Sequence, residues 1–229
     1  VLGSNGAGKS TLFSAIAGSI RPDTGSVVLD GVDVTALPDF RRSKYIGRLF
    51  QDPLKGTAPN MTIEENLALA YLRSSERHSG FSMISARDRS NFRQQLSRLG
   101  LGLEDRMDSP VGLLSGGQRQ ALTLLMATLV TPKLLLLDEH TAALDPATAE
   151  KVLELTRSIT AEHSITCMMI THDISAALSL GNRTIIMHAG KIAGELTGEE
   201  RENLDEAQLL EVFRRFRLND DRLLFRETE

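Results

Sequence analysis

Short apolar runs of strand length alternate along the chain with longer stretches in which apolar residues recur every three or four positions. The runs are apolar on both faces, which is typical of parallel strands covered by helices on either side. We predict strands at 26–29, 45–50, 134–137, 165–171, 184–187 and 192–196. Helices are predicted at 9–17, 87–99, 116–129, 147–162 and 174–180. This order indicates an α/β protein with a mostly parallel sheet.

The alternation is interrupted between the second and third predicted strands. From Thr62 to about Leu101 the pattern is helical, apart from a polar segment at 74–85 that we interpret as a loop. Near the end of the chain, apolar residues at helical spacing predict an amphipathic helix, namely Leu209, Leu210, Phe213 and Phe216. We therefore predict an α/β core at 1–51 and 115–200, an inserted helical subdomain at 52–114, and a helical tail at 201–229.

The composition of the 229 residues is that of an ordinary globular protein, with 41% hydrophobic and 24% charged residues. The formal net charge is −4. Because surfaces that bind nucleic acid are usually rich in Lys and Arg, this balance argues against a nucleic-acid partner. No apolar stretch approaches the roughly 20 residues that a membrane-spanning helix requires, so the chain is not expected to cross a membrane by itself.

A glycine-rich segment near the start of the chain matches the phosphate-binding pattern G-x-x-x-x-G-K-[ST]. Its backbone N–H groups can close around phosphate oxygens, and the helix that follows adds its positive N-terminal end. Lys9 is expected to reach the β- and γ-phosphates, and the Ser10 hydroxyl is expected to bind Mg²⁺. The alternative, a simple glycine-rich turn, does not account for the helix that follows. The predicted ATP-binding residues are Gly3, Ser4, Asn5, Gly6, Ala7, Gly8, Lys9, Ser10 and Thr11.

Two acidic residues follow the most apolar predicted strand, 134–137. Ligands of open α/β sheets bind at the C-terminal ends of the strands, so Asp138 is expected to hold Mg²⁺ there. Glu139 is expected to act as the general base that polarises the attacking water. The alternative is a strand that ends in two solvated acids, and the phosphate-binding loop in the same chain argues against it.

The string Leu114-Ser115-Gly116-Gly117-Gln118 offers a second anion site, with a hydroxyl and backbone N–H groups at a helix start. The alternative is an ordinary helix cap. With the two preceding motifs, this string resembles the signature of the ABC (ATP-binding cassette) ATPases. The resemblance implies a P-loop NTPase fold with a mostly parallel sheet and an inserted helical subdomain. It also implies that ATP is sandwiched between two copies of the chain, with the signature of one copy facing the γ-phosphate bound by the other.

Three further residues match positions of the same family. The resemblance implies that Gln51 contacts Mg²⁺ and the attacking water, that His172 contacts the γ-phosphate, and that Asp145 lies in a loop that crosses between subunits. The expected catalytic residues are therefore Glu139, His172 and Gln51, and the expected metal-binding residues are Ser10, Gln51 and Asp138. The residues expected to bind ATP across the dimer are Ser115, Gly116, Gly117, Gln118 and Asp145.

The chain departs from the family pattern at two places. His140 stands where the family usually has proline; we expect it to be a loop residue, the alternative being that it tunes Glu139. The aromatic residue that stacks on adenine lies upstream of the phosphate-binding loop in this family. Because only Val1 and Leu2 remain of the strand that should precede that loop, we expect the natural protein to extend upstream.

Segments 50–62, 138–141 and 180–183 resemble the ATPases of bacterial importers labelled for tryptophan, tyrosine or other amino acids. The resemblance implies integral membrane permease subunits as partners, docked near Gln51 and 54–61. It implies an extracytoplasmic solute-binding protein as an indirect partner, and a peripheral position on the cytoplasmic face of the cell membrane. The alternative is a soluble ABC ATPase that acts on ribosomes or DNA. Such proteins usually carry two cassettes or long coiled coils, and neither feature is present in this sequence.

Overall fold

The computed structural model describes residues 1–74 and 84–224, with side chains described for residues 1–72 and 84–215. The chain divides into two compact units. The first consists of residues 1–14 and 169–229, and the second of residues 15–168. Most of the loop predicted at 74–85 lies outside the described residues. No helix in the described part of the chain is long and apolar enough to span a membrane.

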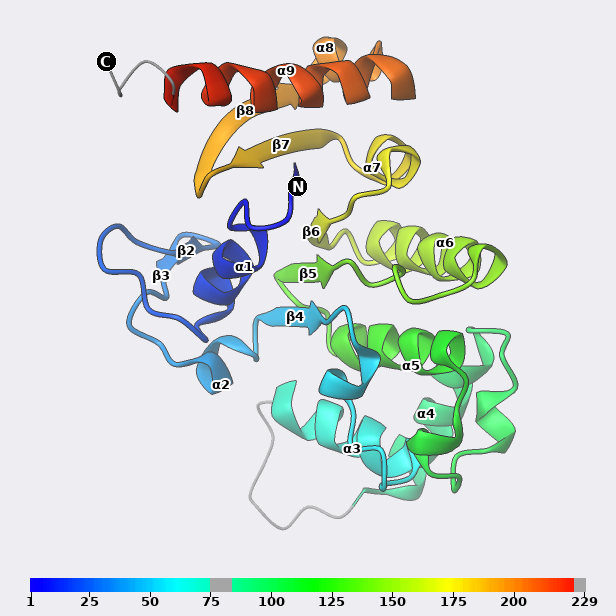
Figure 1. The fold of residues 1–229 in the computed structure, drawn as a ribbon. Helices are drawn as coiled ribbons and strands as arrows, with labels where there is room; N and C mark the ends of the chain where they lie inside the picture. Colours follow the sequence, from blue (N-terminus) through cyan, green and yellow to red (C-terminus); the bar gives the residue numbers. More distant parts are fainter. Residues whose placement is uncertain (75–83, 225–229) are drawn as a thin grey trace. The chain divides into compact units, whose positions relative to one another are not determined.

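The first unit is built on a three-stranded sheet in the order β1-β7-β8. Strand β1 (Leu2–Gly3) pairs in parallel with β7 (Arg183–His188), and β7 pairs in antiparallel orientation with β8 (Lys191–Thr197). Helix α7 (Ile174–Leu180) precedes β7, and α8 (Gly198–Glu202) and α9 (Glu206–Leu224) follow β8. Helix α9 packs against α7 and β7 (Figure 1), where the side chain of Leu209 is fully buried. The helix predicted for the tail is therefore confirmed, with Leu209 and Phe213 on its packed face; the side chain of Phe216 lies outside the described residues.

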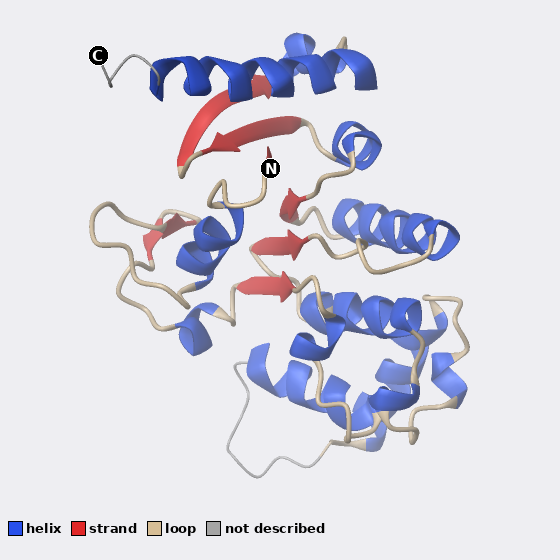
Figure 2. Cartoon of the chain, viewed as in Figure 1, coloured by secondary structure: helices blue, strands red, loops and turns tan. Residues whose placement is uncertain are grey.

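The second unit contains a sheet in the order β4-β5-β6 (Figure 2). Strands β4 (Ile46–Leu49) and β5 (Leu134–Asp138) are parallel, with Ile46 opposite Leu134. Strand β6 (Thr166–Ile170) contains the boundary between the units, and α6 (Pro146–Glu162) connects β5 to it. The buried, uninterrupted Leu134–Leu137 run explains why β5 could be identified from its apolar pattern.

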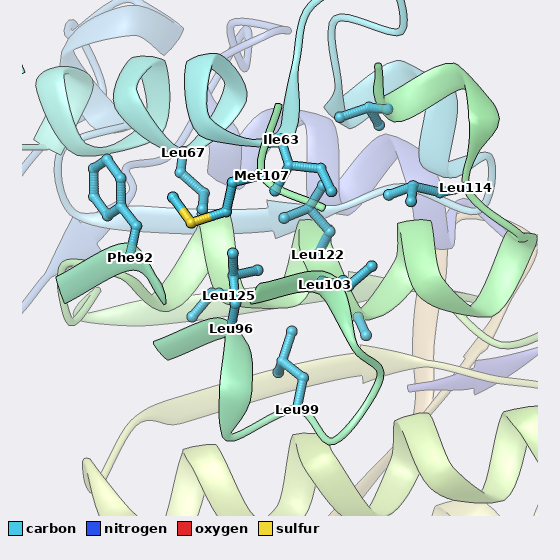
Figure 3. Close-up of a cluster of buried hydrophobic side chains, with 12 residues drawn as sticks. Ile63, Leu67, Phe92, Leu96, Leu99, Leu103, Met107, Leu114, Leu122 and Leu125 are labelled. Carbon is cyan, nitrogen blue, oxygen red and sulfur yellow. The ribbon is translucent and has the colours of Figure 1, made fainter. Parts of the chain in front are cut away.

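A helical layer in the second unit has its own apolar core (Figure 3). It is formed by α3 (Ile63–Ser74), α4 (Ala86–Ser97) and α5 (Gly116–Thr128), together with the short 3-10 turns Leu103–Asp105 and Val111–Leu113. Leu122 and Leu125 of α5 pack in one cluster with Ile63, Phe92 and Leu96. Helix α5, which begins at the signature, therefore shares its apolar face with the segment predicted as an inserted subdomain. The division at residues 52–114 itself stays a prediction.

Segment 28–42 differs most from the sequence-based prediction. Strand β2 is only Val28–Leu29, and it forms a hairpin with β3 (Val32–Asp33) that the apolar pattern did not reveal. Asp30 and Gly31 connect the two strands with positive φ angles of 52° and 78°, as expected for a two-residue hairpin turn. Helix α2 (Asp39–Arg42) was also not predicted, because four residues are too few to show a helical period.

Arg42 is the largest fully buried side chain in the described part of the chain, and it caps the end of α1 (Lys9–Ala17). Its guanidinium donates hydrogen bonds of 2.8 to 2.9 Å to four backbone carbonyls, those of Ala15, Ile16, Thr35 and Leu37. The first two are C-terminal carbonyls of a helix and have no partner within it. A Cβ atom at Gly18 would lie 2.8 Å from Arg42 Nε, so the close packing also requires this glycine.

Arg42→Met is expected to lower the free energy of unfolding by about 2 kcal/mol, because buried carbonyls lose their donors. Urea unfolding followed by circular dichroism measures this loss. Arg41→Met is the matched control; Arg41 is exposed on the same short helix, so its replacement should change stability by no more than about 0.5 kcal/mol. Equal stabilities of the two variants would show that the cap contributes little.

Candidate functional site

The predicted phosphate-binding loop lies between β1 and α1, in the first unit. Gly6 and Gly8 adopt positive φ angles of 81° and 93°, which L side chains rarely adopt. The turn between β7 and β8 is fastened to the loop, since Gly190 N donates a 3.1 Å hydrogen bond to Ala7 O. A Cβ atom at Gly8 would lie 3.3 Å from Gly190 Cα, so this packing leaves little room for a side chain.

Lys9 is the buried cation of this loop, with only 8% of its surface exposed. Its Nζ donates hydrogen bonds of 2.8 Å to Gly3 O and 3.0 Å to Ser4 O. The ammonium is thus held over the loop by two backbone carbonyls, beside the positive N-terminus of α1. Ser10 and Thr11 follow in the first turn of α1, and both are exposed.

His172 belongs to the same unit as the phosphate-binding loop. It is exposed, and it lies between the end of β6 and Asp173, which caps α7 by accepting a hydrogen bond of 3.1 Å from Ala176 N. Thr171 N donates to Val1 O at 3.4 Å, so the residue before His172 lies beside the strand that leads into the loop. The C-terminal ends of β6 and β1 therefore present His172 and the loop at the same edge.

The two predicted acids lie in the second unit, at the end of β5. Asp138 is the last residue of the strand, and Glu139 follows with a φ angle of 45°. Such a left-handed backbone is uncommon for a residue other than glycine and is often associated with function. Ala142 N donates a 3.0 Å hydrogen bond to Glu139 O, which closes a turn directly after the acids.

Arg48, on the neighbouring strand β4, was not identified from the sequence. Burial lowers the pKa of its guanidinium, and the negative charge of Asp138 acts in the opposite direction. The guanidinium also lies 4.6 Å from the centre of the Phe50 ring. A cation within the otherwise apolar predicted strand 45–50 was the available signal, because a charged residue in a buried strand is rare without a partner.

The signature segment forms the start of α5. Ser115 Oγ accepts a 3.3 Å hydrogen bond from Gln118 N, and Gln118 Oε1 accepts one of 3.2 Å from Ser115 N. This reciprocal pair is a capping box, so the helix-cap interpretation is correct as far as local structure goes. Ser115 and Gly116 are nevertheless exposed, and the first N–H groups of a helix have no carbonyl partner within it.

The segment that ends at Asp145 lies against the signature within the second unit. A Cβ atom at Gly116 would meet Leu144 Cδ2 at 3.4 Å, and one at Gly117 would meet Thr148 Cγ2 at only 2.1 Å. Asp145 caps α6 by accepting a 3.1 Å hydrogen bond from Thr148 N. Hydrogen bonding to Thr148 also lowers the pKa of the Asp145 carboxyl, which is exposed and ionised at neutral pH. The structure thus brings together two segments that were each predicted to face a second copy of the chain.

His140 is buried, with 3% of its surface exposed, although it lies in the turn after Glu139. Its Nε2 is 3.3 Å from Thr156 Oγ1 on α6. Burial lowers the pKa of His140 to about 4, so the imidazole is neutral at physiological pH. The residue is therefore a packed anchor within its loop, which the sequence could not distinguish from an exposed loop histidine.

Gln51 is exposed directly after β4, at the start of a segment that borders a groove in the second unit. Asp52 caps the 3-10 turn Pro53–Gly56 by accepting a 2.9 Å hydrogen bond from Leu54 N. The groove has a volume of about 810 Å³. Apolar and cationic side chains line it, among them Phe40, Phe50, Leu69, Lys44, Arg48 and Lys55.

Comparisons with known proteins identify the family of the chain. A family model described as ABC transporter matches residues 1–142. The tyrosine transport ATP-binding protein of Clostridioides difficile is 42% identical over 213 residues, which are 93% of this chain and 84% of that protein. The thiamine import ATP-binding protein of Shigella flexneri is 32% identical over 87% of this chain and 81% of its own length. A methionine import ATP-binding protein of Vibrio vulnificus is 34% identical over 84% of this chain, which spans only 54% of that longer protein.

Solved structures extend the comparison to the fold. A dimeric ATP-binding cassette in a post-hydrolysis state, bound to ADP and Pi, matches with a TM-score of 0.73 and 29% identity. The match covers 86% of this chain and 83% of that chain. An ADP-bound ATP-binding cassette of an ABC transporter matches with a TM-score of 0.71 and 29% identity, over 88% of this chain and 81% of that one. The predicted α/β fold class is therefore confirmed.

Proposed function

The chain belongs to the ABC transporter family, and on that premise we propose that it is the ATP-hydrolysing subunit of a bacterial importer for an amino acid. As in its relatives, ATP binding and hydrolysis energise the transport of a solute across a membrane. The proposal that the solute is an amino acid rests on the 42% identity to a tyrosine transport ATP-binding protein over 93% of the chain. The subunit lies peripherally on the cytoplasmic face of the cell membrane, bound to permease subunits that receive solute from an extracytoplasmic binding protein.

In this proposal the phosphates of ATP lie in the glycine loop, where the backbone N–H groups and Lys9 neutralise their charge. A water molecule attacks the γ-phosphorus, Glu139 accepts its proton, and the bond to the β-phosphate oxygen of the departing ADP breaks. Gln51 and His172 orient the water and the γ-phosphate. These roles follow from family position and from the placement of each residue at a strand end.

The residues proposed to bind Mg²⁺ together with the nucleotide have suitable side chains. Ser10, Gln51 and Asp138 offer hydroxyl, amide and carboxylate oxygens, the ligands that this hard cation prefers. In the part of the chain that the structure describes, no three His, Cys, Asp or Glu residues are grouped as a metal cage. Mg²⁺ that is bound with a nucleotide usually keeps several waters and phosphate oxygens as ligands. The ion would neutralise charge on the phosphate oxygens.

Two copies of the chain would close around two ATP molecules. The signature of one copy, in which Ser115 and Gly116 are exposed, would contact the γ-phosphate bound to the other copy through Ser115, Gly116, Gly117 and Gln118, with Asp145 beside them. Two observations support this arrangement: the signature and the Asp145 segment lie against each other, and a similar cassette is known as a dimer bound to ADP and Pi. The bound nucleotide would thus form part of the interface, and hydrolysis would release it.

The groove lined by Phe40 and Leu69 is the proposed docking surface for the permease. Both side chains are large, apolar and exposed, at 66% and 49% respectively, and such exposed apolar surface is typical of protein–protein contacts. Phe50, the neighbour of Gln51, lines the groove, so movement at this surface can reach the residue proposed to contact the water and Mg²⁺.

Phe40→Asp and Leu69→Asp are expected to uncouple transport from hydrolysis. Each places a charge on the docking surface, so co-purification with the permease subunits and amino-acid uptake should fall at least tenfold. ATP hydrolysis by the isolated subunit should stay within twofold of the original rate. Val32→Asp is the control, because Val32 is 61% exposed on the hairpin outside the groove. A parallel loss of hydrolysis, or an equal effect of Val32→Asp, would contradict the docking assignment.

A further inference from the structure

The backbone at Glu139 is held in a conformation that needs support from its surroundings. A φ angle of 45° places this residue in the left-handed region, which is unfavourable for side chains other than glycine and asparagine. The turn bond from Ala142 N to Glu139 O restrains the residue on one side. This bond lies within the turn itself, so a contact between the turn and another element of the second unit can also hold Glu139 in place.

The adjacent residue supplies such an anchor. His140 is 97% buried, and its imidazole Nε2 lies 3.3 Å from the hydroxyl of Thr156 on α6. The Thr156 hydroxyl has one proton, which it donates to Val152 O at 2.8 Å. The hydroxyl must therefore accept from His140, so Nε2 carries the imidazole proton. Both partners are buried, and the bond joins the turn after Glu139 to the middle of a long helix.

We propose that His140 is a positioning residue for Glu139: its hydrogen bond to Thr156 fixes the turn on α6 and thereby holds the catalytic carboxylate in place. The inference rests on the proposed role of Glu139 as the general base. Because misplacing a reacting group by about 1 Å can cost a hundredfold in rate, an anchor one residue from the base is well placed to influence turnover.

Helix α6, which holds Thr156, is also connected to the Asp145 segment and the signature. The same helix begins at the Asp145 cap, and Thr148 in its first turn contacts the signature glycine Gly117. The turn after Glu139, the segment that ends at Asp145 and the signature therefore all contact the same helix of the second unit. A substitution that loosens the His140–Thr156 bond should disturb the base while leaving the other two contacts intact.

The first experiment compares Thr156→Val with Thr156→Ser in steady-state ATP hydrolysis. Valine keeps the shape of threonine but cannot accept a hydrogen bond, whereas serine keeps the hydroxyl. We expect Thr156→Val to lower kcat about tenfold with KM for ATP within twofold, and Thr156→Ser to retain kcat within twofold. Thr128→Val is the matched control, since Thr128 is another buried helical threonine whose hydroxyl bonds only within its own helix, to Leu124 O and Leu125 O.

Melting temperatures separate positioning from simple destabilisation. Thr156→Val and Thr128→Val should both melt a few degrees lower, but only the first should lose kcat at temperatures well below the transition. In the double variant His140→Leu/Thr156→Val both polar partners are absent, so the melting temperature should recover while kcat stays low. Full kcat in Thr156→Val, an equal kcat loss in Thr128→Val, or recovery of kcat in the double variant would each overturn the inference.

Glu139→Gln distinguishes failure of this inference from failure of the proposed function. If Glu139→Gln is inactive and Thr156→Val is fully active, only the positioning role of His140 is wrong. If Glu139→Gln hydrolyses ATP at the original rate, Glu139 is not the base and the inference falls with that assignment.

Discussion

Replacing Glu139 with glutamine is expected to lower kcat for ATP hydrolysis about a thousandfold while ATP still binds. Glutamine has nearly the shape of glutamate and can occupy the same place after β5, but it cannot accept the proton of the attacking water. General-base catalysis is typically worth a factor of about 100 to 10,000, and this substitution removes that factor alone. Phosphate release in steady state measures the loss. Glu199→Gln is the control, because Glu199 is an exposed acid on α8.

The same variant should form a stable dimer only when Mg·ATP is present. If ATP binds between two copies and hydrolysis releases them, a chain that binds without hydrolysing accumulates in the closed state. Size-exclusion chromatography with and without Mg·ATP detects the change in mass. A variant that stays monomeric at saturating ATP would contradict a closed homodimer formed by the subunit alone, and a dimer that forms without nucleotide would contradict the role of ATP in the interface.

Much of the fold could be predicted from the sequence because apolar residues recur with different spacings in its helices and its strands. The helix at 9–17 and the helix at 174–180 were predicted with the bounds that the structure has. The former follows a glycine loop, and the latter follows an Asp that caps it. The hairpin Val28–Asp33 escaped prediction because its strands have two residues each, too few to display an alternation.

Buried charges were the main feature that the sequence could not reveal. Arg201 donates to the carbonyls of Ala177 and Leu178 at the end of α7, as Arg42 does at the end of α1. Nothing in the local sequence separates these arginines from exposed ones nearby, since their burial depends on carbonyls that are distant along the chain. The burial of His140 could not be predicted for the same reason, because its partner Thr156 lies sixteen residues away.

The motif residues were easier to find because each motif carries its own local geometry. Gly6, Gly8 and Lys9 are adjacent in the chain, and a loop of this kind folds in the same way wherever it occurs. The contact between the signature and the first turn of α6, by contrast, is not encoded in a local motif. It joins Gly117 to Thr148 across thirty residues, and only the folded structure shows that Thr148 leaves no room for a Cβ atom at this glycine.

Gly117→Ala is therefore expected to lower ATP hydrolysis at least a hundredfold. The added Cβ would lie 2.1 Å from Thr148 Cγ2, far inside contact distance, so α5 and α6 must move apart at the signature. Thr148 has little freedom to turn away, because threonine is limited to two common χ1 rotamers in a helix. A shift of about 1 Å at the signature is enough for a loss of this size.

Thr148→Ala tests whether this steric contact is the cause. The substitution removes Cγ2, so Gly117→Ala/Thr148→Ala should recover most of the hydrolysis that Gly117→Ala loses, and Thr148→Ala alone should stay near the original rate. When each of these variants also carries Glu139→Gln, dimerisation with Mg·ATP should be weakened by Gly117→Ala, recovered in Gly117→Ala/Thr148→Ala and unaffected by Thr148→Ala alone. If the double variant remains as inactive as Gly117→Ala, the contact with Thr148 is not what requires glycine. The requirement would then arise from the close approach of the signature backbone to the γ-phosphate of the opposite copy, where a methyl group would occupy the space of the nucleotide.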